Sequence, residues 1–361
     1  MSDELADVRA EIAETDRQIV ELVARRSTFA DRLGSLKRQH GSPIRDYGHE
    51  KTVVDRARSV AESVGVSEDL AERIMLELIR ASLEVEERGQ VEASSAGTGR
   101  RALVIGGSGQ MGSWFVRFLQ SQGFGVNVAD PDAGDFDDWR DAESIFDVYV
   151  IATPLLIASE VLAQMSEDPP DGLIFDIGSL KTPLRSGLNR LVAAGGRVAS
   201  IHPMFGPETS LLSGRHVVVV DLGDHGATEE TRELFSSTMV TMVEMDLDSH
   251  DRLIAYILGL SHALNIAFFT ALAESGETAA RLADLSSTTF DRQLAVASLV
   301  ARENPNLYFE IQHLNEYGGE SLAALAAAVG RLQEVVGSGD AGAFAELMQR
   351  GSKYFDETGL G

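Results

Sequence analysis

The run Ala102-Leu103-Val104-Ile105-Gly106-Gly107-Ser108-Gly109-Gln110-Met111-Gly112 leads from a short apolar segment into a cluster of glycines. An amphipathic segment from Gln110 to about Gln122 follows, so the predicted order is strand, tight turn and helix. The spacing Gly107-x-Gly109-x-x-Gly112 fits the fingerprint of dinucleotide-binding folds. In these folds one glycine makes the turn, one lets the backbone approach a pyrophosphate, and one allows close helix–strand packing. Backbone N–H groups at the start of the helix would then face the phosphates.

A second predicted strand ends in Asp130, roughly 20 residues after the first glycines. An acidic side chain in this place accepts hydrogen bonds from the ribose hydroxyls and repels a 2′-phosphate. The sequence therefore favours NAD over NADP as the cofactor, and the alternative is an aspartate that merely ends a strand. The predicted cofactor residues in this part are Gly107, Gly109, Gln110, Met111, Gly112 and Asp130.

Length and composition are typical of soluble multidomain proteins. The chain has 361 residues, enough for two or three cores, with 44% hydrophobic and 24% charged residues. No run approaches the roughly 18 apolar residues of a membrane span, and the first residues lack the basic start of a signal peptide. The absence of cysteine excludes disulfides and thiolate chemistry. We therefore expect a cytoplasmic protein.

The formal net charge of −25 argues against nucleic acid and anionic membrane surfaces as partners. Lysine occurs only at positions 37, 51, 181 and 353, and the other side chains counted as basic are arginine. An acidic, lysine-poor surface resembles proteins of salt-loving organisms. The alternative is a generic acidic protein encoded by a GC-rich genome.

Residues 1–90 are predicted to be one all-helical domain. Apolar residues recur at helical spacing over 3–39, Gly41-Ser42-Pro43 breaks the pattern, and further helices are expected over 45–64 and from Ser67 onward. Residues 91–100 are mostly small and polar, which predicts a flexible linker.

Strands and helices alternate from 101 to 246. The predicted strands are 101–106, 125–129, 147–152, 172–177, 197–201, 215–221 and 241–245. This alternation predicts a doubly wound, mostly parallel α/β sheet of the Rossmann type. Over 247–361 only helices are expected, at 254–273, 279–301, 306–317, 321–336 and 341–354. Several are apolar around most of their circumference and must be buried, within a helical domain or between subunits.

Two cations occupy the first helix where its stripe should be apolar. On an ideal helix Arg26 and Lys37 point within about 20° of each other, roughly 16 Å apart, so both can close on a small dianion. Arg9 points about 100° away from Arg26 and suits a different pocket, in a partner subunit. The alternative for each is an apolar stem buried along the helix with its charged head in water.

These helices resemble the all-helical chorismate mutases. The resemblance rests on residues 5–12, 22–26, Lys37, 43–46 and Glu50. It implies that Arg26 and Lys37 bind the substrate carboxylates and that Arg9 reaches into the other subunit. It also implies that the hydroxyl end and its neighbouring groups meet Asp46, Glu50 and Ser82. His49 departs from the pattern, because arginine is common there.

The resemblance also places Glu86 where family members have Gln or Glu facing the ether oxygen. The mutase reaction is an intramolecular rearrangement, so it needs a compressed conformer and positive charge beside the breaking C–O bond. To donate a hydrogen bond to that oxygen, Glu86 must carry a proton. We therefore expect mutase activity to fall as pH rises.

Three runs at predicted strand ends carry polar side chains: 151–154 (Ile-Ala-Thr-Pro), 175–181 (Phe-Asp-Ile-Gly-Ser-Leu-Lys) and 200–207 (Ser-Ile-His-Pro-Met-Phe-Gly-Pro). The nicotinamide half of a dinucleotide lies at this edge of a parallel sheet, which makes Thr153 and Pro154 cofactor candidates. A histidine here, with an ordinary pKa of about 6.5, suits proton removal from an alcohol. The alternative is that His202 only forms hydrogen bonds within its loop.

The runs 104–112, 176–181 and 202–207, together with His250-Asp251, resemble the prephenate dehydrogenases over about 101–355. A mutase-like head on such a body resembles the bifunctional enzymes of tyrosine biosynthesis, with chorismate and prephenate as substrates. The resemblance implies that prephenate gives a hydride to NAD while His202 draws on the ring hydroxyl. Loss of carbon dioxide then yields 4-hydroxyphenylpyruvate.

The resemblance implies roles for three further residues. Ser179 would hold the same hydroxyl and orient His202. His262 would line the substrate pocket, in the region where family members sense tyrosine as a feedback inhibitor. The family places a carboxylate-binding arginine on the predicted helix near 280–295. We assign this role to Arg292, although it lies one position after the family's arginine, and Asp291 occupies the position that matches that arginine.

Two other interpretations stay open. One is a different NAD-dependent dehydrogenase, for a hydroxy acid or for arogenate. The other keeps the dehydrogenase but makes the head a non-catalytic, regulatory or dimerising module, because of His49. Buried helices in the tail and the outlying Arg9 favour a homodimer, and no metal site is expected.

Overall fold

The computed structural model describes residues 2–142 and 145–358, which form two compact units. The first unit contains the residues up to Thr153, Glu160–Gly178 and Gly187–Met245. The second contains Pro154–Ser159, Ser179–Ser186 and the chain from Asp246 onward. The predicted fold class is confirmed: a three-helix head, a Rossmann-type α/β domain and a helical tail follow one another along the chain.

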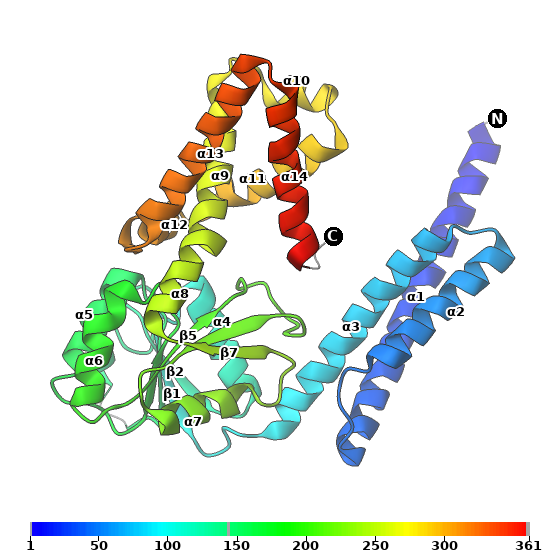
Figure 1. Cartoon of the computed structure of the whole chain (residues 1–361). Helices are drawn as coiled ribbons and strands as arrows, with labels where there is room; N and C mark the ends of the chain where they lie inside the picture. The colour runs from blue at the N-terminus through cyan, green and yellow to red at the C-terminus, as the bar shows by residue number, and fades with distance from the viewer. Residues whose placement is uncertain (1, 143–144, 359–361) are drawn as a thin grey trace. The chain divides into compact units, whose positions relative to one another are not determined.

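The head consists of α1 (Ser2–His40), α2 (Tyr47–Val64) and α3 (Glu68–Ser94), with α1 and α2 both packed on α3. Asp46 caps α2 by accepting a hydrogen bond from the His49 N–H at 3.0 Å. The N-terminal part of α1 extends beyond α2 and α3 (Figure 1), and its apolar side chains, Leu5, Val8 and Ile12, are at least half exposed.

The segment 91–100, predicted as a flexible linker, is largely ordered by helix and core contacts. Helix α3 continues to Ser94, and Val91 is only 6% exposed because it packs into the core of the α/β domain. The turn that follows is tied by a 2.9 Å hydrogen bond from the Gly97 N–H to the Gln122 carbonyl. The small, polar composition concealed one apolar residue in helical register, and that residue joins the head to the α/β domain.

The α/β domain is built on one seven-stranded sheet in the order β2-β1-β3-β4-β5-β6-β7. The strands are β1 (Arg101–Ile105), β2 (Gly125–Ala129), β3 (Val148–Ile151), β4 (Leu173–Asp176), β5 (Arg197–Pro203), β6 (His216–Val220) and β7 (Thr241–Met245). The first five strands are parallel to one another. Strand β6 runs antiparallel to β5, and β7 pairs parallel to β6. Strand order reverses between β1 and β3, and ligands of such sheets bind at the carboxyl ends beside this switch point.

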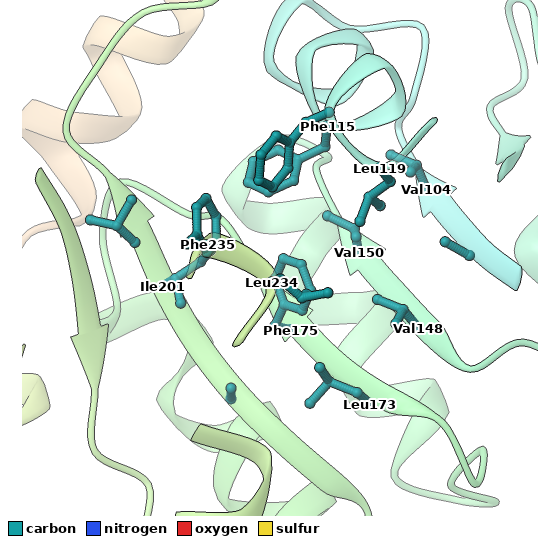
Figure 2. Close-up of a cluster of buried hydrophobic side chains, with 14 of the residues drawn as sticks. Val104, Phe115, Leu119, Val148, Val150, Leu173, Phe175, Ile201, Leu234 and Phe235 are labelled. Carbon is teal, nitrogen blue, oxygen red and sulfur yellow. The ribbon is translucent and has the colours of Figure 1, made fainter. Parts of the chain in front are cut away.

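Aromatic and branched side chains fill the space between the sheet and two helices, α4 (Gln110–Ser121) and α7 (His225–Phe235). Figure 2 shows Phe115 of α4, Phe235 of α7 and Phe175 of β4 in this cluster. The Phe115 ring centroid lies 5.9 Å from that of Phe175 in a tilted pair and 6.4 Å from that of Phe235 in an edge-on pair, both favourable geometries for aromatic rings. Two more helices, α5 (Leu155–Met165) and α6 (Arg185–Ala193), and two short turns, η1 (Trp139–Asp141) and η2 (Thr182–Leu184), complete the region.

The tail is helical throughout its described residues. It contains α8 (Leu247–Ile254), the π-helical turn η3 (Ala255–Leu260), α9 (Ser261–Glu274), α10 (Ala279–Asp284), α11 (Thr288–Arg302), α12 (Pro305–Leu314), α13 (Gly318–Ser338) and α14 (Ala341–Thr358). The single helix predicted over 279–301 is wrong. Ser287 accepts the Phe290 N–H and starts a new helix, because serine competes for backbone hydrogen bonds and favours the cap.

By length and composition alone, one helical run in the described residues is long and apolar enough to cross a membrane. The continuous helical run Leu247–Glu274 contains an 18-residue window of mean hydropathy 1.7, and only 22% of that window is buried. Polar residues, Ser261, His262 and Asn265, interrupt the run and hid it from a search for unbroken apolar sequence. Tyr256, Ile257 and other apolar side chains of this run are about half exposed in the single chain.

Candidate active sites

The head encloses a cavity of about 210 Å³ between its three helices. Its polar wall consists of Arg26, Lys37, Asp46, His49, Glu50, Ser82 and Glu86, and its apolar wall includes Phe29, Leu33, Ile44, Val53, Ile79 and Leu83. All the mutase residues predicted on the head therefore lie together, except Arg9. The mixture of two cations with an apolar wall suits a small ring that carries carboxylates.

Arg26 reaches across the cavity from α1 to α3. Its guanidinium donates hydrogen bonds to the Leu78 carbonyl and to the Ser82 hydroxyl, which in turn donates to the same carbonyl at 2.9 Å. Burial lowers the pKa of Arg26, and the nearby Glu86 carboxylate opposes that shift. The guanidinium is thus partly desolvated, which strengthens its attraction for an anion.

Lys37 and Glu86 form an ion pair in the same wall. The Lys37 ammonium donates to a Glu86 carboxylate oxygen at 2.7 Å and to the Ile44 carbonyl at 2.5 Å. Glu86 is only 4% exposed, so this pair lies in a region of low polarity. The pair places a positive charge and a carboxyl group side by side at one end of the cavity.

Glu50 is held from behind by Arg45. The guanidinium of Arg45 donates to both carboxylate oxygens, at 2.9 and 3.0 Å, and this pairing raises the pKa of Arg45 although burial opposes it. The sequence did not single out Arg45 for this role. One signal was available in the sequence. Arg45 lies just before the start of α2 and Glu50 lies in its first turn, so the long arginine side chain can reach the carboxylate.

Arg9 is exposed on the N-terminal part of α1 and is not in the wall of its own chain's cavity. The predicted role for Arg9 therefore requires a second copy of the chain.

The glycine turn after β1 has the shape that a bound dinucleotide requires. Gly106 has φ +82°, and a Cβ there would lie 2.8 Å from the Ala152 carbonyl oxygen. A Cβ on Gly112 would overlap the Gly106 carbonyl, so only glycine lets α4 pack this closely on the turn. Gly109 precedes α4, and no side chain caps that helix start among the described residues. The backbone N–H groups of Gln110 and Met111 are in the first turn of α4, where the dipole favours an anion.

Asp130 and Thr153 lie beside the same turn. The Asp130 carboxylate is 9% exposed and accepts N–H hydrogen bonds from Ser108 and Asp132, each at 3.1 Å. Thr153 closely contacts the turn, because a Cβ on Gly106 would lie 2.9 Å from its methyl group. The Thr153 hydroxyl is buried without a hydrogen-bond partner in the described structure, as expected of a group that completes its bonding with a ligand. Pro154 follows it in the chain and precedes α5.

His202 lies near the carboxyl end of β5 and is 6% exposed. It is opposite Val218 of the antiparallel strand β6, and Pro203 ends β5 directly after it. Ser200, two residues earlier and hence on the same face of the strand, has a buried hydroxyl with no partner in the described structure. The sequence missed Ser200, although the alternation of strand side chains pairs it with His202.

In the second unit, Asp251 anchors the segment that carries Ser179. Its carboxylate accepts hydrogen bonds from the Lys181 and Thr182 N–H groups, at 2.9 and 2.6 Å, and from the Thr182 hydroxyl. The His250 ring lies 2.6 Å away. Burial raises the pKa of Asp251, but these hydrogen bonds outweigh it and hold the pKa below its ordinary value. The Ser179 hydroxyl is buried and has no partner among the described residues.

His262 of α9 stacks on Tyr308 of α12 with ring centroids 4.1 Å apart. Burial lowers the pKa of His262, and its Nδ1 atom has no partner in the described structure, so the ring is neutral at pH 7. Arg292 is exposed on the second turn of α11, and the neighbouring Asp291 accepts a hydrogen bond from the Ser286 hydroxyl. Over residues 2–142 and 145–358, no group of His, Asp and Glu has the geometry to hold a metal ion.

Three family models match successive parts of the chain. They are chorismate mutase type II over residues 8–87, the prephenate dehydrogenase nucleotide-binding domain over 117–243, and the prephenate dehydrogenase dimerization domain over 246–350.

The chain is also similar to curated proteins and solved structures. A T-protein of Enterobacter agglomerans is 28% identical, with 98% of this chain and 94% of the relative covered. The 4-amino-4-deoxyprephenate dehydrogenase of Streptomyces pristinaespiralis is 30% identical, over 68% of this chain and 88% of the relative. The crystal structure of an A. aeolicus prephenate dehydrogenase, in complex with hydroxyphenyl propionate and NAD+, shares the fold with a TM-score of 0.57 at 17% identity, over 72% of this chain and 98% of that one.

The domain order and these likenesses agree with the glycine turn, the histidine strand and the cation-lined cavity. The chain belongs to the prephenate dehydrogenase family, in the bifunctional form that carries a chorismate mutase type II domain as its head.

Proposed function

We propose that the head converts chorismate to prephenate and that the rest of the chain oxidises prephenate with NAD, with loss of carbon dioxide, to 4-hydroxyphenylpyruvate. The observation that carries the mutase half is the convergence of Arg26, Lys37 and Glu86 on one cavity. The dehydrogenase half is supported by the glycine turn beside Asp130 and Thr153, and by the family models that match this region and the tail.

In the mutase cavity the chain supplies conformation and charge. Arg26 and Lys37 bind the two carboxylates and hold the substrate in a compressed conformer, and Arg9 of a second copy completes the clamp. Asp46, Glu50 and Ser82 meet the hydroxyl end. The Lys37 ammonium donates to the ether oxygen, where negative charge develops as the C–O bond breaks, and the Glu86 carboxyl group beside it can donate there only when it carries a proton.

Mutase activity should fall as pH rises, because a carboxyl group at Glu86 donates to the ether oxygen only in its protonated form. The substitution Glu86→Gln should remove this dependence, since an amide N–H donates at every pH. The measurement is chorismate disappearance between about pH 5 and 9 in the absence of NAD. A wild-type rate that does not change over this range, and that Glu86→Gln leaves unaltered, would exclude Glu86 as the donor.

In the dehydrogenase the first unit holds the cofactor. Backbone groups of Gly107, Gly109, Gln110, Met111 and Gly112 face the pyrophosphate, and Asp130 accepts from the ribose. Thr153, whose hydroxyl is buried without a partner, and Pro154 border the nicotinamide. NAD when bound accepts the hydride from the ring carbon of prephenate.

The remaining residues act on prephenate. His202 takes the proton of the ring hydroxyl as the hydride leaves, and Ser179 holds that hydroxyl and orients His202. His262, neutral at pH 7, lines the substrate pocket and suits recognition of the phenol of tyrosine as a feedback inhibitor. The exposed apolar side chains of 247–274 and of α1 are covered in a cytoplasmic homodimer.

Replacing Arg292 with alanine should raise KM for prephenate by about 10- to 100-fold, because a carboxylate loses its charged partner. The affinity for NAD should not change. Initial rates with added prephenate give KM, and fluorescence titration gives the NAD affinity. Arg281→Ala is the matched control, since Arg281 is also exposed, on α10, and its surface ion pair with Glu277 contributes little. An unaltered KM in Arg292→Ala would reject the assignment.

The overall function is tested by feeding chorismate and then prephenate, with NAD or NADP. Chorismate absorbance should fall without any cofactor, and reduced NAD should appear with either substrate. A chain that oxidises prephenate but leaves chorismate intact has a non-catalytic head. One that oxidises neither contradicts the proposal.

A further inference from the structure

A segment of the α/β domain packs directly behind the mutase cavity of the head. Leu211 contacts Ile79 and Leu83 of α3 in a small buried cluster. Leu211 begins the five-residue loop Leu211–Arg215, which precedes β6 and follows the strand of His202 by only a few residues. This loop, called the docking loop below, touches the mutase site at two points.

The first point is Ser213. The guanidinium of Arg45 donates hydrogen bonds to two residues. Its Nε and one terminal nitrogen donate to the Glu50 carboxylate, and the other terminal nitrogen donates to the Ser213 hydroxyl at 2.7 Å. The fork geometry of a guanidinium fixes these directions relative to each other. The position of Ser213 therefore determines where Arg45 lies, and Arg45 determines where the Glu50 carboxylate lies.

The arrangement of two cavities shows that this contact comes from the far side of Glu50. A second cavity of about 340 Å³ lies at the docking loop, and Arg45 and Ser213 are in its wall. Glu50, Ile79 and Leu83 line both this cavity and the mutase cavity. Substrate thus meets Glu50 from one side while Arg45 and Ser213 hold it from the other.

The second point is Glu87, which is 3% exposed and follows Glu86 directly on α3. Its two carboxylate oxygens accept the N–H groups of Leu212, at 2.7 Å, and of Met239, at 2.5 Å. Burial raises the pKa of Glu87, and these two N–H donors oppose that shift. Because neighbouring helical residues differ by about 100° in direction, fixing Glu87 against the α/β domain also fixes the direction in which Glu86 enters the mutase cavity.

We propose that the docking loop of the dehydrogenase is a positioning element of the mutase site. Ser213 orients Glu50 through Arg45, and the Leu212 N–H orients Glu86 through Glu87. The proposal rests on the assignment of Glu50 and Glu86 to the mutase reaction. It makes mutase activity dependent on a loop that has no contact with the mutase substrate.

The test is the substitution Ser213→Ala, which removes the acceptor for Arg45 and no catalytic group. Mutase kcat should fall about tenfold with a much smaller change in KM, because the substrate clamp of Arg26 and Lys37 stays intact while Glu50 is misplaced. Oxidation of added prephenate should keep its kcat and KM. Ser213→Thr should restore mutase kcat, because the hydroxyl returns.

Ser210→Ala is the matched control, because Ser210 is an exposed serine of the same connection and, unlike Ser213, has no side-chain hydrogen bond to the head among the described residues. Equal mutase kcat in Ser213→Ala and wild type would overturn the inference, as would a loss that Ser213→Thr does not restore. Glu50→Ala distinguishes the role of Glu50 in the mutase site from the positioning role of Ser213. If Glu50→Ala retains mutase activity, the site assignment fails. If Glu50→Ala abolishes activity while Ser213→Ala has no effect, only the positioning role fails.

Discussion

Replacing His202 with alanine should lower kcat for prephenate oxidation by about 10³-fold, since a positioned general base contributes roughly 10² to 10⁴. His202 is nearly buried, so solvent cannot easily substitute as a proton acceptor. KM for prephenate should change little, because substrate carboxylates bind to arginine rather than to the imidazole. Chorismate rearrangement in the same preparation should proceed at the wild-type rate, which shows that the variant is folded.

The control for this prediction is His216→Ala. His216 begins β6, the strand next to β5, but its side chain is exposed. Prephenate oxidation should be unaffected there. A His202→Ala enzyme within a few-fold of wild type would mean that another group accepts the hydroxyl proton, and Ser200 would be the first residue to examine, because its buried hydroxyl has no partner in the described structure.

The second large effect is expected for Arg26→Ala, which should lower mutase kcat/KM by about 10³-fold or more. The guanidinium is partly desolvated and reaches from α1 to Ser82 on α3, so its removal takes a preorganised charge out of the cavity. Arg26→Lys should recover only part of the activity, because an ammonium cannot make the forked contacts of a guanidinium. The measurement is chorismate consumption without cofactor.

The neighbouring Arg25 provides a control at the same charge. Arg25 is exposed and lies over the Phe29 ring, 5.8 Å from its centroid. Arg25→Ala removes one positive charge from the same turn of α1. A loss of mutase kcat/KM that both variants share is therefore due to the change in net charge and not to the loss of a contact in the cavity. If Arg26→Ala and Arg25→Ala behaved alike, the cavity would not be the mutase site.

Features governed by local sequence rules could be predicted well. The glycine turn follows from backbone geometry, because Gly106 adopts a positive φ and Gly112 has no room for a Cβ. The convergence of Arg26 and Lys37 follows from helical periodicity alone, and both line one cavity. The strands follow from short apolar runs, and all seven are present close to their predicted bounds.

Features that depend on distant partners could not be predicted. Nothing near Arg45 indicates that Ser213 accepts its third contact, since the two are far apart in the sequence. Val91 looked like part of a linker because its burial depends on the core of the following domain. The π-helical turn Ala255–Leu260 inside an apolar helix likewise has no local signature in the sequence, and it packs against α13 and α12, which lie later in the chain.

The continuity of α3 has a consequence for dividing the chain into separate enzymes. A single helix carries the mutase residue Glu86, the carboxylate of Glu87 and the core residue Val91. A chain cut between the head and the α/β domain would expose Val91 if the head kept it, or would leave a gap in the α/β core if it did not. The N–H groups of Leu212 and Met239 would lose Glu87 as their acceptor. Neither half is therefore expected to be as stable alone as it is in the whole chain.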